Sequence, residues 1–457
     1  MTRTATTFEN LNPSTGECIT EIECATREEV HAAVARARAA QREWARTPLE
    51  ERIATVRKVA EILYADAEAM ADTVTKEMGK PRAHALGEAQ SVRKIFEYYG
   101  EKMPEYFAPQ DIAEGERLSR LVREPIGVIG AITPWNFPVG IPLWTLVPAL
   151  MAGNGIVFKP SEIVPLTGER IHRAFAAHLP EDLIPLCQGA DETGKALVDS
   201  DVDMIAFVGS RAVGKAIMEA SASRVRPLAL ELGGKDPLLI LDDADLDKAA
   251  QMAVWGSVSN CGQVCCSVER IYVDQKIAPE LESRIKSVLE QVKVGDGFEK
   301  ETNVGPMASR EQRDHVLSQV DDAVKRGARL EAGGSAIDGG GNFIQPTLLA
   351  DLDESMAVMT EETFGPVIAL RPVKDAEEAI RLANDTRYGL GASVLSGDQE
   401  RALEVASRLE AGTVGVNRGS GTSLVCPWGG VKESGLGRML GTSAIEEFTQ
   451  TKVLHLK

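Results

Sequence analysis

The chain has 457 residues, of which 44% are hydrophobic and 26% charged, and its formal net charge at pH 7 is -18. This length exceeds what one ordinary hydrophobic core needs, so it predicts two or three domains of a globular protein. Nucleic acids and anionic membranes select for basic surfaces, and the acidic charge therefore argues against both as partners.

Signals for membranes, disulfides and metals are lacking in the sequence. No charge-free apolar stretch of about 20 residues occurs, and residues 1–10 lack the apolar centre of a signal peptide. We therefore expect a cytoplasmic protein. An odd number of cysteines, seven, is scattered through the chain and favours reduced thiols. With six histidines and neither an H-E-x-x-H nor a C-x-x-C pattern, no metal site is expected.

The first hundred residues are predicted to be helical. Thr26 and Glu29 match a capping box that opens the first helix. Residues 47–50 open a second helix, which continues with helical spacing until Gly79 ends it. A third helix is expected from about residue 83 to residue 99.

Strands and helices are predicted to alternate from residue 118 onward. Residues 118–124 alternate apolar and polar side chains, as a half-exposed strand does, and residues 126–132 read as a buried strand. Further strands, with helices between them, are expected at 156–158, 184–186, 204–208, 228–230, 237–241, 271–273, 367–370 and 413–416. This alternation predicts doubly wound parallel sheets, which bind ligands at the carboxyl ends of their strands.

A last strand is expected at residues 453–456. A terminal strand with no following element often pairs with a free sheet edge elsewhere. We expect that edge to belong to another subunit of an oligomer.

A glycine-led turn from Gly262 to Ser267 presents Cys265 and Cys266 just before a predicted strand. A thiol on a loop backed by a rigid strand is placed as a nucleophile needs to be. Adjacent cysteines seldom form a disulfide, because the ring is strained. Two small buried apolar residues remain the alternative interpretation.

Two other strand ends carry candidate catalytic groups. Asn136 is the one polar side chain of a rigid turn, P-W-N-F-P, and its amide can donate to a developing oxyanion; the alternative is a structural Asx turn. Glu231 in E-L-G-G-K lies among apolar residues, which suits a general base because burial raises its pKa. A salt bridge with Lys235 or Arg226 is the competing interpretation.

Three further stretches favour a dinucleotide site. Lys159 and Glu162 follow a strand, where they can bind ribose hydroxyls or form only a solvated ion pair. Gly209 and Ser210 open a helix, whose amides bind phosphate, although Gly-Ser also caps ordinary helices and no G-x-G-x-x-G occurs. The rigid stretches at 361–367 and 427–435 place an aromatic residue at a loop tip or serve packing alone.

Taken in order, PWNFP, KPSE, FVGSxxVG, ELGGK, GQVCC, EETFGPV and PWGGVKxSGxGR closely resemble the NAD(P)-dependent aldehyde dehydrogenase superfamily over nearly the whole chain. The resemblance implies an α/β fold with two doubly wound parallel-sheet domains and a small β oligomerisation element. It also implies the oxidation of an aldehyde to a carboxylic acid by a homodimer or homotetramer. The implied division is 1–106 and 126–232 for NAD binding, 233–433 for catalysis, and 107–125 and 434–457 for bridging between subunits.

The resemblance assigns roles to the candidate residues. Cys265, the fourth residue of G-Q-x-C, is implied to be the nucleophile that forms a thiohemiacetal and then a thioester, and Cys266 to line the pocket. Asn136 and the Cys265 N–H are implied to hold the oxyanion. Glu231 is implied to activate the water that hydrolyses the thioester, and its presence favours hydrolysis over transfer to coenzyme A.

For the cofactor, the resemblance implies NAD or NADP, with NAD preferred because the carboxylate of Glu162 repels a 2'-phosphate. The implied contacts are Trp135, Lys159, Ser161, Glu162, Gly209, Ser210, Val213, Leu232, Glu362 and Phe364.

Two departures from the family pattern bear on mechanism and substrate. Met439 stands where a glutamate thought to assist proton release is common. Trp144 and Ser259 stand where relatives specific for succinate semialdehyde carry arginines, which predicts a neutral aliphatic or aromatic aldehyde. Arg418 is the substrate-lining residue that can favour the alternative, succinate semialdehyde. A non-catalytic protein of the same fold is the remaining alternative.

Overall fold

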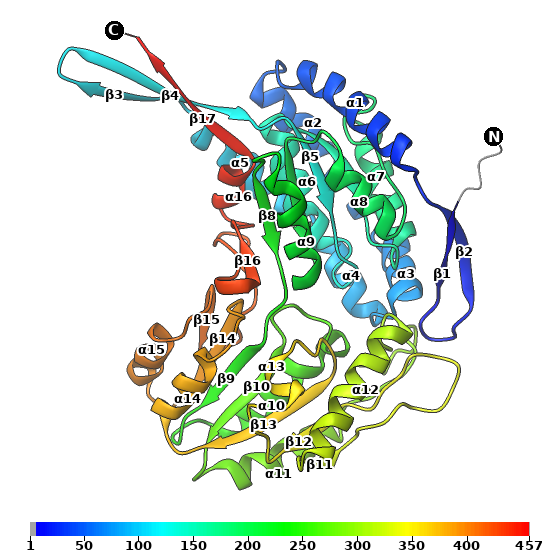
Figure 1. Cartoon of the computed structure of the whole chain (residues 1–457), viewed down its shortest axis with the longest axis vertical. Coiled ribbons are helices and arrows are strands. Elements are labelled where there is room, and N and C mark those ends of the chain that lie inside the picture. The colour runs from blue at the N-terminus through cyan, green and yellow to red at the C-terminus, as the bar shows by residue number, and fades with distance from the viewer. Residues whose placement is uncertain (1–5, 457) are drawn as a thin grey trace.

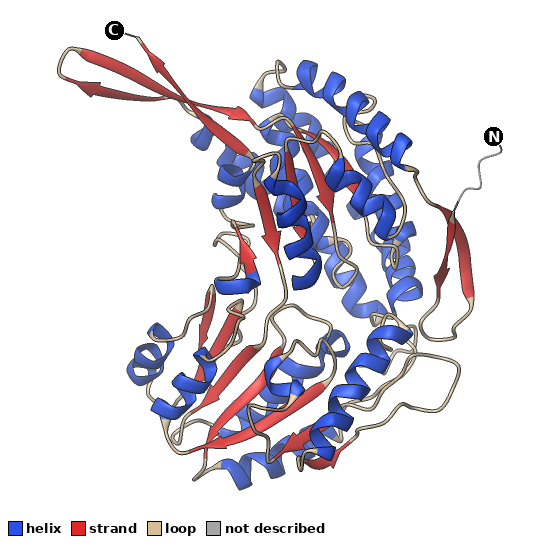
Figure 2. Cartoon of the chain, in the orientation of Figure 1, coloured by secondary structure: helices blue, strands red, loops and turns tan. Residues whose placement is uncertain are grey.

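The computed structural model describes residues 6–456. Two helix-covered parallel sheets lie end to end, and a three-stranded antiparallel sheet projects from the first of them (Figures 1 and 2). A hairpin of β1 (Thr7–Leu11) and β2 (Cys18–Glu23) precedes the first helix. The predicted α/β architecture with two parallel sheets is confirmed.

The N-terminal helices begin where the sequence predicted but are more finely divided. In the capping box of α1 (Arg27–Trp44), Thr26 and Glu29 each accept a hydrogen bond from the other's backbone N–H. The predicted second helix is two helices that meet at Asp66, whose carboxylate lies 2.8 Å from Arg170. The third is also two, and Ser91 Oγ at the break bonds back to Glu88 O. The four are α2 (Leu49–Ala65), α3 (Ala67–Met78), α4 (Arg82–Gln90) and α5 (Arg93–Phe107).

The first parallel sheet has the strand order β16-β8-β7-β5-β6. Four strands run parallel, and the short β16 adds to the edge antiparallel to β8. The chain passes from β5 to β6 on one side and then returns to β7 on the other, so the strand order reverses beside β5. The strands are β5 (Val128–Ile132), β6 (Gly155–Lys159), β7 (Met204–Val208), β8 (Leu228–Glu231) and β16 (Gly435–Leu436).

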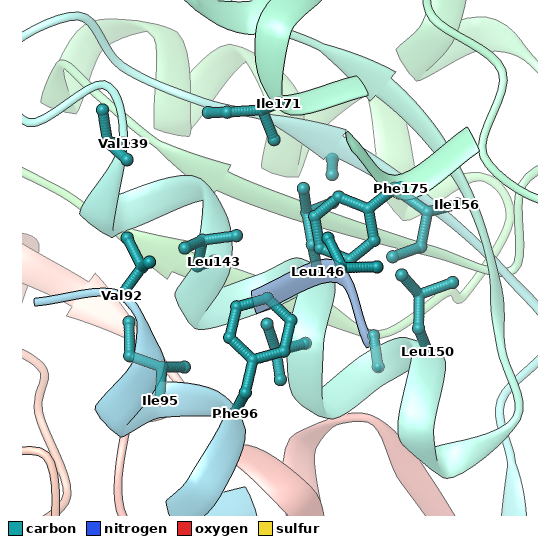
Figure 3. Packing of buried hydrophobic residues seen from close by; sticks show 14 of the residues in the cluster. Val92, Ile95, Phe96, Val139, Leu143, Leu146, Leu150, Ile156, Ile171 and Phe175 are labelled. Carbon is teal, nitrogen blue, oxygen red and sulfur yellow. The ribbon is translucent and has the colours of Figure 1, made fainter. Parts of the chain in front are cut away.

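Alternate residues of these strands belong to different cores, because helices cover both faces of the sheet. One face packs on α1, α8 and α9, and the other on the helices α2 to α7. Figure 3 shows the second core, where the rings of Phe96 and Phe175 stack with their centroids 6.1 Å apart beside the apolar helix α6. These crossover helices are α6 (Gly140–Ala152), α7 (Pro165–Ala176), α8 (Asp191–Asp199) and α9 (Arg211–Ala222).

The second sheet has seven strands in the order β11-β12-β13-β10-β9-β14-β15, and all pairs except β11–β12 are parallel. The strands are β9 (Asp236–Ile240), β10 (Val268–Asp274), β11 (Arg329–Ala332), β12 (Thr347–Ala350), β13 (Val367–Val373), β14 (Gly391–Leu395) and β15 (Thr413–Val416). The helices are α10 (Leu246–Val258), α11 (Ala278–Leu289), α12 (Arg310–Lys325), α13 (Ala357–Thr360), α14 (Ala376–Asn384) and α15 (Gln399–Ser407).

Two predicted strands differ in the structure. Residues 184–186 run beside β6 and share backbone hydrogen bonds with it, but only an isolated bridge between Phe158 and Leu186 forms. The terminal strand, β17 (Thr449–His455), pairs along one edge with β4 (Arg117–Pro125) of the same chain, because α16 (Ser443–Glu447) returns the chain to that edge. β3 (Gln110–Glu114) completes the projecting sheet.

Candidate active site

The ends of the first sheet converge on one point of the molecule. Asn136 follows β5, Gly209 and Ser210 follow β7, and Glu231 is the last residue of β8. Since β5 and β7 flank the reversal in strand order, their carboxyl ends form the crevice in which doubly wound sheets bind ligands. The turn that carries Cys265 enters this crevice from the second sheet, just before β10 begins.

A cleft of about 760 Å³ opens at this point and is lined by groups from both sheets. It brings together all three predicted catalytic residues and six of the ten predicted cofactor residues. The predicted residues that line it are Asn136, Glu231, Cys265, Trp135, Gly209, Ser210, Leu232, Glu362 and Phe364.

The turn before β10 is tied directly to the loop that carries Asn136. Asn136 is buried, and its Nδ2 donates to the carbonyl of Gln263 at 3.1 Å. Gly234 packs on the same turn, since a Cβ there would lie 2.8 Å from Cys265 O. The structural Asx turn considered for Asn136 is therefore not its arrangement, because the amide reaches across to a residue 127 positions away.

The thiol of Cys265 is half-buried and faces the cleft. Hydrogen bonding with the Cys266 thiol, burial and the nearby carboxylate of Glu362 all raise the pKa of Cys265 well above its ordinary value. The thiol is therefore protonated at neutral pH in this state of the protein, and catalysis requires a group that removes its proton.

Glu231 has an environment suited to accepting a proton. Its carboxylate is 3% exposed, and neither oxygen has a hydrogen-bond partner among residues 6–456. The nearest backbone donor, Met439 N–H, already donates to Trp428 O at 2.7 Å. Burial, followed by the proximity of Cys265, raises the pKa of Glu231 well above its usual range. The predicted alternative of a structural salt bridge is wrong, because Lys235 pairs with Glu269 and Arg226 donates to the carbonyls of Ser200 and Val198.

A buried ion pair fixes the loop that carries Glu362 and Phe364. Lys235 Nζ lies 2.7 Å from the Glu269 carboxylate, which also accepts the backbone N–H groups of Thr363 and Phe364 at 2.8 Å each. The Phe364 ring stacks edge-on against Trp135, 5.5 Å between centroids. Burial, with Glu269 nearby, raises the pKa of Glu362 to about 8.

The remaining predicted cofactor residues lie outside this cleft. Lys159 is buried, and its Nζ is 3.6 Å from the half-exposed carboxylate of Glu162, so an ion pair forms, although it is not a fully solvated one. Ser161 Oγ accepts from Ile163 N, and Ser210 Oγ caps α9 by accepting from the backbone N–H of Val213 at 3.4 Å. Val213 itself is exposed.

None of the four predicted substrate-lining residues lines this cleft. Cys266 and Trp144 pack instead against the core beneath the first sheet. Ser259 is exposed and bonds back to Trp255 O at 2.6 Å, and Arg418 is exposed on the loop after β15. Met439 is buried, and its backbone pairs with that of Trp428, so this part of the P-W-G-G loop serves packing.

Six lining residues were missed by the sequence analysis. Gln312 and His315 come from α12, one helical turn apart, and His315 Nε2 lies 3.3 Å from Glu362 O. No local motif marks them, because α12 reaches the cleft only through the packing of the second sheet. The other four lie within or near recognised motifs and could have been found from them: Pro134, Ile141, Val208 and Gly233.

Residues 6–456 hold no disulfide and no cluster of metal ligands. All seven cysteines are free thiols. No group of three or more histidine, cysteine or acidic side chains in these residues could hold a metal ion. None of the helices among them is both long and apolar enough to span a membrane.

Known proteins resemble the chain over nearly its whole length. The family model described as the aldehyde dehydrogenase family matches residues 1–454. A betaine aldehyde dehydrogenase of Bacillus subtilis is 37% identical over 454 residues, which cover 97% of this chain and 92% of that protein. A probable succinate-semialdehyde dehydrogenase (NADP+) of Sinorhizobium fredii is 35% identical over 452 residues, covering 98% and 92%. The solved structure of betaine aldehyde dehydrogenase from Staphylococcus aureus in complex with NAD+ is 35% identical, with a TM-score of 0.95 and coverage of 98% of this chain and 91% of that one.

Proposed function

The chain belongs to the aldehyde dehydrogenase family, and we propose that it oxidises a neutral aliphatic or aromatic aldehyde to the carboxylic acid through a thioester on Cys265. The observation that carries this proposal is the meeting of Cys265, Glu231 and Asn136 in one cleft from three distant segments. A non-catalytic protein of this fold would have no need to keep all three groups together.

The first step is attack by the Cys265 sulfur on the aldehyde carbon. The thiol proton leaves to water in the cleft as the sulfur attacks, and Glu231 acts only in the second half of the reaction. The electron pair of the carbonyl bond moves to its oxygen, which becomes an oxyanion. Asn136 Nδ2 has a second N–H to donate to that oxygen, and the backbone N–H of Cys265 bonds to no other group among residues 6–456.

The second half of the reaction returns the thiol. When bound, a nicotinamide dinucleotide would supply the acceptor for the aldehyde's hydride. Glu231 then takes a proton from water, whose oxygen attacks the thioester carbon, and the Cys265 thiolate leaves as the acid is released. Glu231 passes that proton to the thiolate, which restores the thiol and the carboxylate. The raised pKa of the buried Glu231 carboxylate suits this step, because a carboxylate with a higher pKa is a stronger base toward water.

The residues at the crevice fit a dinucleotide. The N-terminus of α9 at Ser210 provides amides for a pyrophosphate, and Glu362 provides a carboxylate for ribose hydroxyls beside Cys265. We propose that Lys159 and Glu162 bind the other ribose. The further proposed contacts are Trp135, Ser161, Gly209, Val213, Leu232 and Phe364.

The carboxylate of Glu162 favours NAD over NADP, because a 2'-phosphate would meet a like charge. The ratio of kcat/KM for the two cofactors tests this, and Glu162→Gln should narrow it. A wild-type preference for NADP, as the name of the Sinorhizobium relative indicates for that protein, would contradict it.

The charge of the cleft favours an uncharged substrate. Its acidic lining groups among the described residues are Glu231 and Glu362, whose pKa values burial raises, and no lysine or arginine lines it. Succinate semialdehyde remains the alternative. A relative bears that name, and the exposed Arg418 on the loop after β15 is a cation that could pair with the substrate's carboxylate. A panel of butanal, benzaldehyde, betaine aldehyde and succinate semialdehyde, assayed by NADH absorbance, separates them. A strong preference for succinate semialdehyde would replace the neutral substrate.

The nucleophile is tested by Cys265→Ala. This variant should oxidise none of the aldehydes in the panel while still binding NAD, and retained turnover would contradict the assignment. Cys426→Ala is the matched control, because Cys426 is an exposed thiol outside the cleft.

We also propose that the chain acts as a homodimer or homotetramer through the projecting sheet. Ile112, Val453, Leu454 and Leu456 are each at least 40% exposed there, which is unusual for apolar side chains unless a partner covers them. The proposed division of the chain assigns residues 1–106 and 126–232 to NAD binding and residues 233–433 to catalysis. Residues 107–125 and 434–457 are assigned to bridging between subunits. Sedimentation as a monomer at micromolar concentration would contradict the proposed oligomer.

A further inference from the structure

The backbone just before the nucleophile has an uncommon conformation. Asn260, Cys261 and Gly262 have φ values of 52°, 58° and 71°, so three successive residues lie in the left-handed region. Glycine adopts this region freely, asparagine tolerates it better than most residues, and other side chains are disfavoured. Such a turn persists only where the surrounding structure holds it.

The side chain of Asn260 supplies that hold. Its Nδ2 donates to two carbonyls, Asn136 O at 3.1 Å and Gln263 O at 3.2 Å. Gln263 Nε2 donates back to Asn260 O at 3.0 Å, and Asn136 Nδ2 donates to Gln263 O at 3.1 Å. The three amide residues therefore form a closed set of hydrogen bonds.

The same turn is anchored on its other side. Gln263 Oε1 accepts from Ala308 N at 2.9 Å, and Cys261 Sγ packs 3.4 Å from Met307 Sδ. Gly262 lies against the loop after Phe364, since a Cβ there would be 2.1 Å from Gly365 O. The turn thus has little freedom to shift.

These contacts join the two sheets at the reacting groups. Asn136 belongs to the loop after β5 of the first sheet, whereas Cys265 precedes β10 of the second. Nothing in the covalent chain fixes their separation, because 128 residues lie between them. Asn260 lies in the same turn as Cys265. Its side-chain amide donates to the backbone carbonyl of Asn136 and so contacts the Asn136 loop.

We propose that Asn260 is a positioning residue, whose amide holds the Asn136 side chain at the distance and angle needed to donate to the oxyanion on Cys265. The role rests on the proposed function, in which Asn136 is the oxyanion donor. Asparagine suits the position on two counts. It tolerates the left-handed backbone, and its two N–H groups serve two carbonyls that an aspartate oxygen would repel.

A double-mutant cycle tests this, with Asn136→Ala, Asn260→Gly and the double variant. Glycine keeps the left-handed backbone and removes only the amide. The rate of the first NADH burst at saturating NAD should fall about 100-fold in Asn136→Ala and about 10-fold in Asn260→Gly. The double variant should match Asn136→Ala within about twofold, because Asn260 then has no amide to position.

Two results would overturn the positioning role. One is additive loss in the double variant, about 1000-fold, which would mean that Asn260 acts independently of Asn136. The other is an unchanged burst in Asn260→Gly. If that variant does not fold, Asn260→Ser, which is too short to reach both carbonyls, replaces it in the same cycle.

The control variant is Cys426→Ala, which removes an exposed thiol outside the cleft and the turn and should leave the burst within about twofold of wild type. A wild-type protein that gives no burst with any aldehyde would contradict the proposed function itself. A wild-type burst with additive losses would contradict only the role of Asn260.

Discussion

Gly429 lies directly against the carboxylate of Glu231, since a Cβ at position 429 would be only 2.7 Å from Glu231 Oε1. The neighbouring Trp428 is buried, so the loop has no room to retreat. The P-W-G-G stretch therefore shapes the space around the proposed general base, which explains why a glycine follows the tryptophan.

Gly429→Ala should displace the Glu231 carboxylate. Because Glu231 acts after the thioester forms, we expect the steady-state rate of NADH formation to fall about 10- to 100-fold while the burst amplitude stays close to one per active site. Stopped-flow absorbance measures both. Gly87→Ala is the control, since a Cβ at that helical position meets nothing within 4 Å. An equal loss of burst and steady-state rates would contradict the assigned role.

Glu231→Gln should separate the two halves of the reaction more completely. The burst should remain, and the steady-state rate should fall by about 10² to 10⁴. Burial raises the pKa of Glu231, so in the wild-type enzyme the active carboxylate form increases with pH, and turnover should rise with pH until Glu231 is fully ionised. The variant should lose that dependence. A variant with the wild-type pH profile would show that another group titrates.

Cys266→Ala should make the nucleophile more acidic. The Cys266 thiol is the largest cause of the raised pKa of Cys265, so its removal lowers that pKa and increases the thiolate fraction at a given pH. Inactivation by iodoacetamide at pH 7.0 without NAD should become several-fold faster. Cys426→Ala, at an exposed thiol, should leave the rate unchanged. Slower inactivation of Cys266→Ala would contradict this reading of the pair.

The buried pair of Lys235 and Glu269 should matter far more for stability than a surface pair. Glu269→Ala leaves an uncompensated buried lysine and frees two backbone N–H groups, and we expect the free energy of unfolding to fall by about 3–5 kcal/mol. Glu377→Ala, which breaks an exposed pair with Arg408, should cost at most about 1 kcal/mol. Urea unfolding compares the two variants. Equal losses of unfolding free energy in the two variants would show that the Lys235–Glu269 pair does not hold the loop that carries Glu362 and Phe364.

Much of the fold could be predicted from local patterns. The capping box at Thr26, the apolar run of β5 and the alternation of strands and helices each report on neighbouring residues, and each was found where expected. The breaks at Asp66 and Ser91 were missed because they depend on a distant partner or on a single side-chain hydrogen bond. The pairing of β17 with β4 was missed because the sequence of a strand does not determine which other strand it pairs with.

The residues of the candidate site also fall into those predictable from local motifs and those that depend on distant contacts. Motifs at strand ends predicted Asn136, Glu231 and Cys265, and the structure brings the three to one cleft. His315 and Asn260 were not predicted, because one reaches the cleft through helix packing and the other acts through hydrogen bonds across two sheets. The raised pKa of Cys265 could not be foreseen either, since it depends on the orientation of Cys266 and on burial.

The most direct test of the account is to trap the thioester. Glu231→Gln is mixed with NAD and benzaldehyde, quenched in acid after one burst, and digested for mass spectrometry. The account predicts a benzoyl group on the peptide that contains Cys265, in an amount equal to the NADH formed, and none in Cys265→Ala. A full NADH burst without acylation of Cys265 would contradict it.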